Sequence, residues 1–146
     1  MFPTGVVLRG DALYLYYGAA DTTTCVAIGS LKEILKEMKS SPKNRPTFTR
    51  YKRNPILAPQ AKHAWEAKAV FNPAAVDVPG KTVILYRAQG HDDTSVFGYA
   101  ESKNGLSISR RRPDPVYVPR APFEVKQAPG NSGCEDPRLT RFDDTY

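Results

Sequence analysis

Residues 3–17 read PTGVVLRGDALYLYY and residues 73–87 read PAAVDVPGKTVILYR, and the two stretches match without a gap. Each runs from a proline through a short apolar segment and a turn that contains glycine into a second apolar segment rich in tyrosine, leucine or valine. Two such segments around a glycine turn are typical of a β-hairpin. The match therefore predicts an internal repeat of antiparallel strands.

A loop with an Asp-Thr pair follows each hairpin, Asp21–Thr22 in the first copy and Asp93–Thr94 in the second. A third apolar segment comes after each loop, over residues 25–29 and 96–100. Units of several antiparallel strands that recur along a chain are typical of β-propeller blades. We therefore expect an all-β fold made of a partial set of propeller blades, with an irregular β-sandwich as the alternative.

A third copy begins at Pro137, where residues 138–142 lead into an Asp143–Asp144 turn. The residues that precede the three repeat prolines are Phe2, Asn72 and Asp136. In a propeller the innermost strands surround a central channel, so side chains at their ends can meet there from different blades. The repeat therefore predicts that these three positions are equivalent and converge.

One helix is predicted between the copies. Ser30 and Glu33 have the spacing of a capping box. Apolar residues then recur at helical spacing, at Leu31, Ile34, Leu35 and Met38. This stripe predicts an amphipathic helix that packs on the sheets. Basic and turn residues replace the apolar pattern over residues 40–54, which predicts a basic linker.

Charge and hydropathy narrow the classes of function. The net charge is +6, with basic runs between residues 43 and 53 and at Arg110–Arg112. No nucleic-acid-binding motif accompanies either run, so we interpret both as solvated surface rather than as a nucleic-acid site. No apolar run approaches the roughly 20 residues that span a bilayer. Met1–Gly5 lack the features of a secretory signal, so a cytoplasmic location without membrane contact is expected.

Metal binding is not indicated either. Cys25 and Cys134 are the only cysteines and lie outside any CxxC spacing, so we expect both to be reduced and buried. His91–Asp93 could offer metal ligands, but the triplet has no distant partner, and we predict no metal site.

Asp136 is the leading candidate for a proton-transfer group. The ring of Pro137 restricts the residue before it, which predicts an extended Asp136 with a fixed direction. In an extended segment Glu135 would point to the opposite side and Arg138 to the same side as Asp136. The alternative is a surface Asp-Pro turn with an arginine salt bridge.

Asn72 and Arg87 form a second candidate group. The amide of Asn72 can both donate and accept hydrogen bonds, as sugar hydroxyls require. Arg87 ends the apolar segment 83–86, where a guanidinium is costly to bury unless it meets an anion or a polar ligand, although an ordinary strand-end charge is the alternative. Asp21 and Asp93 lie on equivalent loops and could accept hydrogen bonds from ligand hydroxyls. These residues together predict a polar ligand.

Seven segments of the chain resemble glycoside hydrolase family 130, the mannoside phosphorylases and related mannosidases. They are FPTG, LYLYYGAADT, NPIL, WEAKAVFNPAAV, LYRA, GYAES and GCEDPR. The resemblance implies a five-bladed β-propeller with its active site in the central cavity. The order of the segments is permuted relative to one family unit. Residues 1–39 resemble a last blade with its closing helix, 40–54 a linker, and 55–146 a first blade and the start of a second.

The resemblance also implies roles for individual residues. Asp136 would be the catalytic acid of an inverting enzyme that cleaves β-mannosidic bonds, acting through a sugar hydroxyl while inorganic phosphate, a co-substrate and not a cofactor, attacks the anomeric carbon. The residues implied to bind the sugar are Asn72, Arg87, Asp21, Asp93 and Arg138. In the family, the groups that hold phosphate or activate water lie in blades that these segments do not include, so phosphorolysis and hydrolysis both remain open.

A non-catalytic role is the other hypothesis. Two and a fraction blades leave strand edges exposed, and exposed edges favour association with other β-strands. The chain would then be a propeller fragment or a sugar-binding remnant. It would associate with itself or with the rest of a tandem propeller.

Overall fold

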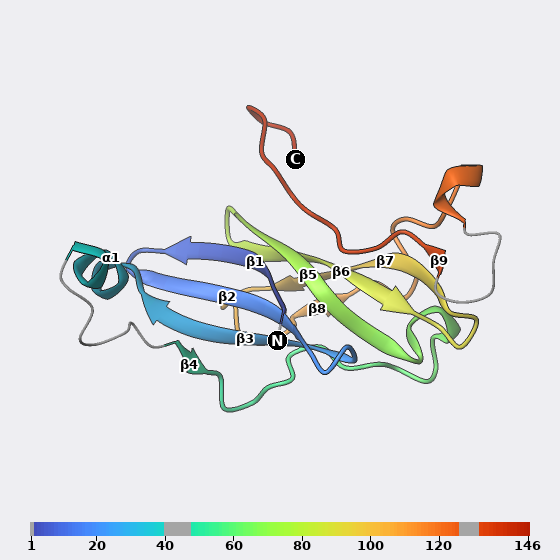
Figure 1. The fold of residues 1–146 in the computed structure, drawn as a ribbon, viewed down its shortest axis with the longest axis horizontal. Helices are drawn as coiled ribbons and strands as arrows, with labels where there is room; N and C mark the ends of the chain where they lie inside the picture. Colours follow the sequence, from blue (N-terminus) through green and yellow to red (C-terminus); the bar gives the residue numbers. More distant parts are fainter. Residues whose placement is uncertain (1, 40–47, 126–131) are drawn as a thin grey trace.

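The computed structural model describes residues 2–39, 48–125 and 132–146, which form two β-sheets, one short α-helix and two 3-10 turns, Ala64–Glu66 and Pro122–Glu124 (Figure 1). The first sheet contains β1 (Phe2–Arg9), β2 (Ala12–Ala19), β3 (Thr23–Ser30) and the short β4 (Thr49–Arg50), in that order. The second contains β5 (Ala69–Val78), β6 (Lys81–Gln89), β7 (Thr94–Ser102) and the short β8 (Arg110–Arg111). All of these pairs are antiparallel, and β9 (Ser132–Gly133) pairs with β7 in parallel. The described chain is therefore mostly β, with two sheets of the same order.

The register of the hairpins corrects the gapless match. Arg9 pairs with Ala12 around one two-residue turn, and Val78 pairs with Lys81 around the other. When these turns are superposed, each residue of the first hairpin falls on a residue of the second that is one position earlier in the sequence than the proline match gives. The innermost strands agree with this shift, because the pair Phe2 and Gly18 then falls on the pair Phe71 and Arg87.

Under the turn-based superposition Pro3, not Phe2, is the equivalent of Asn72. The predicted equivalence of Phe2 and Asn72 is therefore wrong by one residue. The reason is that a bulge interrupts both innermost strands, between Pro3 and Gly5 in β1 and between Phe71 and Ala74 in β5. The two bulges superpose, while the prolines within them do not.

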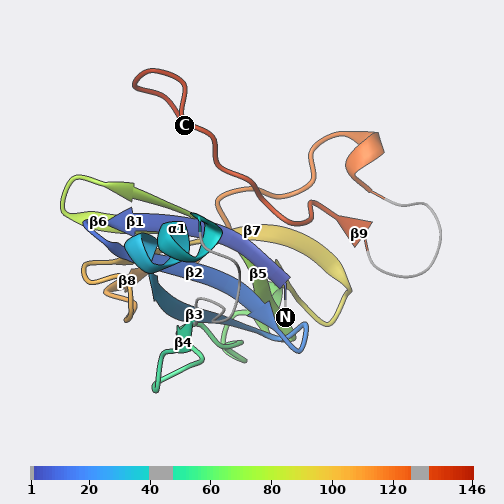
Figure 2. The same ribbon diagram turned by 60° about the vertical axis from the view of Figure 1, so that its left-hand side comes forward.

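The two sheets pack on each other, with β5 lying along β1 and across the face of the first sheet (Figures 1 and 2). Tyr16 and Val26 from the first sheet join Val70, Ile84 and Tyr86 from the second in one buried cluster. This shared core makes the two repeats one body.

Polar contacts between the repeats add to the shared core. Arg9 Nη2 lies 2.6 Å from Asp77 Oδ1. The hydroxyl of Tyr16 donates to the carbonyl oxygen of Gly105 at 2.7 Å, and burial raises the pKa of Tyr16 to about 12. These bonds fix the two sheets relative to each other.

α1 (Leu31–Lys39) begins directly after β3, and its cap is confirmed. The Glu33 N–H donates to Ser30 Oγ at 3.1 Å, and the Lys32 N–H donates to Asp11 Oδ1 at 2.8 Å. The predicted packing of its apolar stripe is wrong within the described chain, because no helix residue is buried and Met38 is 77% exposed. Since Ser30 ends β3 and caps α1 without a loop between them, the helix continues past the end of the sheet (Figure 1).

Part of the expected linker is structured. Residues 40–47 lie outside the described residues, whereas Thr49–Arg50 form β4 at the edge of the first sheet. The Tyr51 N–H donates to the Val26 carbonyl oxygen, and the Asn54 amide bonds both the N–H and the carbonyl of Val26. The second half of this segment therefore belongs to the first sheet.

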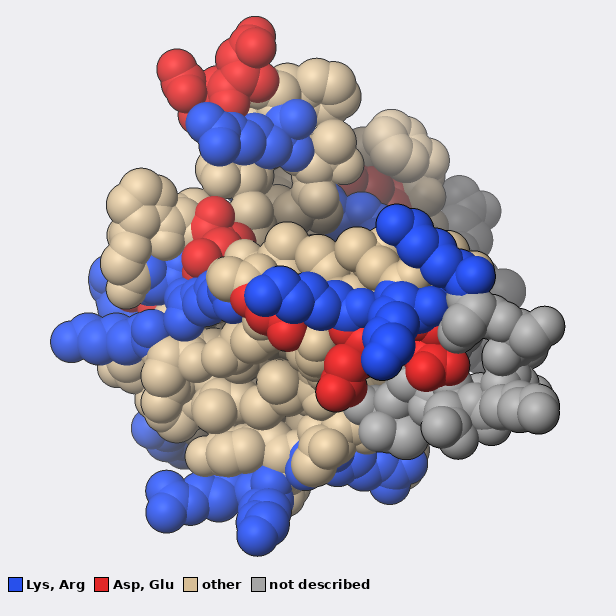
Figure 3. Space-filling model, turned by 90° about the vertical axis from the view of Figure 1, so that its left-hand side faces the viewer, with Lys and Arg blue, Asp and Glu red and all other residues tan. Residues whose placement is uncertain are grey.

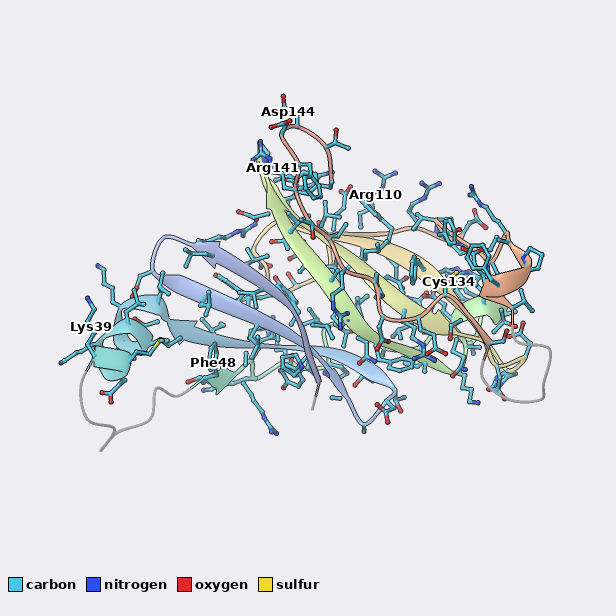
Figure 4. All side chains as sticks on the ribbon, turned by 45° about the horizontal axis from the view of Figure 1, so that its top comes forward. Lys39, Phe48, Arg110, Cys134, Arg141 and Asp144 are labelled. Atoms are coloured by element: carbon cyan, nitrogen blue, oxygen red, sulfur yellow. The ribbon has the colours of Figure 1, made fainter. Side chains whose placement is uncertain are left out.

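The described part of the chain contains no helix long and apolar enough to cross a membrane. Cys25 is a buried free thiol, as predicted, but Cys134 is partly exposed because it lies at the edge of the second sheet, next to β9 (Figure 4). Phe142 pairs with Thr145 around the predicted turn at the C-terminal end, where Arg141 and Asp144 project from the sheets (Figure 4).

On the face in Figure 3, Asp and Glu side chains lie beside a band of Lys and Arg, so this face carries charges of both signs. The interpretation of Arg110–Arg112 as solvated surface is wrong for Arg111, whose side chain is only 11% exposed. Its guanidinium Nη2 lies 2.5 Å from a carboxylate oxygen of the fully buried Glu66. This arginine is therefore part of the interior of the second sheet.

Candidate functional site

Asn72 and Asp136 share an unusual backbone conformation. Asn72, in the bulge of β5, has φ +46°, and Asp136 has φ +49°. The predicted extended conformation of Asp136 is therefore wrong. Left-handed φ values are uncommon outside glycine but are best tolerated by Asn and Asp, whose short polar side chains suit that conformation. Both residues precede a proline, so the chain takes the same left-handed conformation directly before Pro73 and before Pro137.

The structure brings Asn72, Arg87 and Asp136 together. The Asn72 Nδ2 donates to Asp136 Oδ1 at 2.9 Å, and the Arg87 Nη1 lies 3.4 Å from the same oxygen. Arg87 Nη2 also lies 3.0 Å from Glu135 Oε1, and its Nε donates to Ser95 Oγ at 3.0 Å. Residues from β5, β6, β7 and the segment after β9 therefore meet at one place.

Arg87 meets anions, as its cost of burial requires. Arg87 is 7% exposed, and its guanidinium carbon lies 4.7 Å from the centre of the Phe71 ring. A buried guanidinium is tolerated when it is paired and hydrogen-bonded. Glu135 was expected on the side opposite Asp136, and this is wrong, because the left-handed turn at Asp136 ends the alternation of an extended chain. Both carboxylates therefore face Arg87.

The two oxygens of the Asp136 carboxylate differ in their surroundings. Oδ1 receives both donors, from Asn72 and from Arg87. Oδ2 makes no hydrogen bond to any residue that the structure describes, and the side chain is 33% exposed. The two donors on Oδ1 fix the direction of the carboxylate and leave Oδ2 as its oxygen without a partner among the described residues.

The Asn72 amide is only half satisfied. Asn72 is 7% exposed, and its Oδ1 is buried without a hydrogen-bond partner among the described residues. Buried polar atoms are nearly always paired, so such an exception needs an explanation. This oxygen lies against Gly18 of the first sheet.

Three predicted residues lie outside this cluster. Arg138 Nη1 donates to the backbone carbonyls of Asp136 and Pro137 rather than to a carboxylate. Asp93 pairs with Lys68, and Asp21 is exposed on the turn between β2 and β3, where it makes no contact with the cluster. The part of the chain that the structure describes contains no group of three His, Cys, Asp or Glu residues that could hold a metal ion.

Sequence reasoning missed two residues of the site, Ser95 and Gly18, and a third, Glu66, that supports it from behind. Ser95 holds Arg87, and its position directly after the Asp93–Thr94 loop was the available signal. Gly18 lies against Asn72, and its place at the end of a tyrosine-rich strand gave no signal of its own. Glu66 contacts Tyr86 and Arg111 on the other face of β6.

A buried network around Glu66 supports the back of β6. Its Oε2 accepts from the Tyr86 hydroxyl at 2.9 Å and from Arg111, and its Oε1 lies 2.6 Å from His63 Nδ1. Burial raises the pKa of Tyr86, so its hydroxyl stays a donor. Because Tyr86 precedes Arg87 on the strand, this network fixes β6 on the face opposite the candidate site.

Comparison with solved structures gives the class of fold. A GH43 enzyme from Xanthomonas citri superposes with a TM-score of 0.52, covering 80% of this chain and 34% of that one at 16% identity. A GH43 β-xylosidase/α-arabinofuranosidase from a compost metagenome superposes with a TM-score of 0.53, covering 80% and 36%, also at 16% identity. Both are five-bladed β-propellers. The chain therefore has the fold of part of a β-propeller.

The sequence comparison gives the family. A family model described as beta-1,4-mannooligosaccharide phosphorylase, glycoside hydrolase family 130, matches residues 42–146. The chain belongs to this family, and the resemblance read from its motifs is confirmed. The division into a last blade, a linker and a first blade stays a prediction.

Two curated relatives illustrate the relationship. A β-1,2-mannobiose phosphorylase of Thermoanaerobacter sp. (strain X514) is 34% identical over 112 residues, covering 68% of this chain and 35% of that protein. A 4-O-β-D-mannosyl-D-glucose phosphorylase of Bacteroides fragilis is 33% identical over 101 residues, covering 69% and 24%. The chain therefore spans between a quarter and about a third of the relatives that it matches.

Proposed function

We propose that this chain carries the acid-bearing part of an inverting β-mannoside phosphorylase, with Asp136 as the general acid. One observation carries the proposal: Asn72, Arg87 and Asp136 converge from two repeats in a chain that belongs to family 130. Relatives that it matches are named as phosphorylases of β-mannosides, which supports a β-mannoside oligosaccharide as the substrate.

In the proposed reaction, Asp136 delivers a proton through a sugar hydroxyl to the glycosidic oxygen as its bond to the anomeric carbon breaks. An oxygen of inorganic phosphate forms the new bond from the opposite face, so the products are mannose 1-phosphate of inverted configuration and a sugar shortened by one unit. General-acid assistance of this kind contributes about 100- to 10,000-fold. Asn72 and Arg87 hold Oδ1, which leaves Oδ2 to carry the proton.

Asn72 and Arg87 are also proposed to bind hydroxyls of the mannosyl unit whose bond is cleaved, with Asp21, Asp93 and Arg138 as further sugar contacts. Asp21 lies on the turn that leads into β3, and the backbone of the next residue, Thr22, accepts a hydrogen bond from the Val70 N–H at 2.9 Å. This bond places the turn beside the strand that carries Asn72. A ligand at Asn72 could therefore reach Asp21 although the two side chains do not touch.

A second candidate function is a non-catalytic, sugar-binding fragment. The observation that favours it is the cluster of Asn72, Arg87 and Asp136, whose polar groups can bind sugar hydroxyls whether or not a bond is cleaved. A fragment of this kind would bind manno-oligosaccharides without turning them over. Its exposed strand edges would favour self-association or association with further propeller blades.

A product assay tests the proposal. The chain alone, and the chain fused to the part of a family 130 relative that it does not span, would be incubated with manno-oligosaccharides with and without phosphate. We expect phosphate-dependent mannose 1-phosphate, lost in Asp136→Asn and retained in Asp143→Asn, a matched change on the exposed C-terminal turn. Free mannose without phosphate would indicate hydrolysis instead. Undiminished turnover in Asp136→Asn would refute the role of the acid.

A further inference from the structure

The unsatisfied oxygen of Asn72 faces the first sheet. An ideal Cβ built on Gly18 would lie 2.3 Å from Asn72 Oδ1 and 3.1 Å from the Asn72 backbone nitrogen. No side-chain atom fits at 2.3 Å, so Gly18 is the residue that makes room for the amide. The backbone of β2 thus forms the wall behind Asn72.

This wall also decides which way the amide points. With Oδ1 against Gly18, Nδ2 faces Asp136 Oδ1 at 2.9 Å. Rotating the amide by half a turn would place its carbonyl oxygen against the Asp136 carboxylate, and two acceptors would then face each other. The amide therefore leaves one oxygen unpaired in order to keep its donor on Asp136.

Further contacts hold the backbone on both sides of Asn72 to the first sheet. Before it, the Thr24 hydroxyl donates to the Val70 carbonyl oxygen at 3.0 Å. After it, the Thr4 hydroxyl donates to the Pro73 carbonyl oxygen at 2.5 Å. These bonds enclose the bulge in which Asn72 takes its left-handed φ, so the conformation is imposed from outside β5.

We propose that Gly18 is a positioning residue and that the first sheet, residues 2–30, completes the candidate acid site of the second. The family model begins at residue 42, so this contribution comes from outside the matched region. The functional meaning of the contact rests on the proposed role of Asp136. The coupling between Gly18, Asn72 and Asp136 is a property of the fold and can be tested without turnover.

The first test is the NMR signal of the Asn72 side-chain amide in the full 146-residue chain, assigned by its loss in Asn72→Ala. In the wild type we expect the hydrogen-bonded Nδ2 proton to exchange with solvent about tenfold more slowly than an exposed asparagine amide. Gly18→Ala should abolish this protection. Gly29→Ala is the matched control, because the three atoms nearest to its Cβ would all belong to the ring of Phe48, a side chain that can move.

The second test keeps the proposal falsifiable if Gly18→Ala is poorly folded. In a chain that keeps Asn72, Gly18→Ala should lower the melting temperature by about 5 °C or more. Most of this loss should disappear in the Asn72→Ala background, where Oδ1 is gone. Asn72→Ala and the double variant with Gly18→Ala both carry an alanine at φ +46°, so the strain of that alanine cancels when their stabilities are compared.

Each outcome decides the matter. Loss of the slow amide proton in Gly18→Ala, or rescue of its stability by Asn72→Ala, supports the positioning role. An amide proton that stays protected in Gly18→Ala, or a stability loss of equal size in both backgrounds, overturns it. Absence of phosphorolysis with an intact coupling would count against the proposed function alone.

Discussion

Replacing Arg87 with methionine removes the guanidinium that holds residues 135 and 136 on β6 while it keeps most of the side-chain length. The variant loses ion pairs to Glu135 at 3.0 Å and to Asp136 at 3.4 Å. The two carboxylate side chains are 38% and 33% exposed, so each pair is discounted for solvent to about 1 kcal/mol. A total of about 2 kcal/mol makes local opening of this segment roughly 30-fold more frequent.

Hydrogen exchange of the segment after β9 measures this opening. The Ser132 N–H donates to the Asp93 carbonyl and the Cys134 N–H to the Ser95 carbonyl, so both amides report whether the segment stays on β7. We expect their exchange to rise about 30-fold in Arg87→Met, with the strands of both sheets unchanged. Arg138→Met is the control, since among the described residues Arg138 donates to the backbone carbonyls of Asp136 and Pro137, in its own segment.

Exchange within about threefold of the wild type at both amides would refute the reasoning, since it would mean that the ion pairs contribute little. A rise of equal size across β5–β7 would also refute it, because the loss would then be global rather than local.

Three further outcomes can be measured. Glu66→Gln leaves Arg111 buried without its anion, which should cost about 3 kcal/mol and lower the melting temperature by about 10 °C in a thermal melt. The Tyr117 hydroxyl and two backbone N–H groups lower the pKa of Glu124 to about 2 from its ordinary 4.5, so the stability from this carboxylate is complete above pH 4.5 and is lost as the pH falls towards 2. Hydrogen exchange of the surrounding turn should follow that window, and Glu124→Gln should flatten it. Met38→Lys, on the exposed stripe of α1, should change the free energy of unfolding by less than about 0.5 kcal/mol in urea.

Much of the fold could be predicted because its signals are local. Apolar segments around two-residue turns specify hairpins without reference to the rest of the chain. The register between repeats could not be read from a gapless match, because proline occupies different positions in the two superposed bulges, at Pro3 and at Pro73. The exposed stripe of α1 failed as a packing prediction for a similar reason: the stripe shows which face can be buried, not what lies beside it.

In the candidate site too, local sequence signals predicted some features, and distant parts of the chain set the others. Arg87 was identifiable because an arginine after an apolar strand needs an anion, a rule that depends only on burial. The conformation of Asp136 was not, because the proline rule favours extended backbone while the structure imposes the left-handed region that Asp tolerates. Gly18 could not be found from local patterns, since it matters through Asn72, a residue far from it in the sequence.

The two repeats have diverged at one position in a way that makes the site asymmetric. Gly18 and Arg87 fall on each other when the hairpins are superposed. In the second sheet this position supplies the guanidinium that binds Glu135 and Asp136, and in the first it supplies the space that Asn72 occupies. An arginine in both places would collide with Asn72, and a glycine in both would leave the carboxylates unpaired. A site of this kind therefore needs both sheets, so a boundary drawn at the start of the family match would remove a wall of the site.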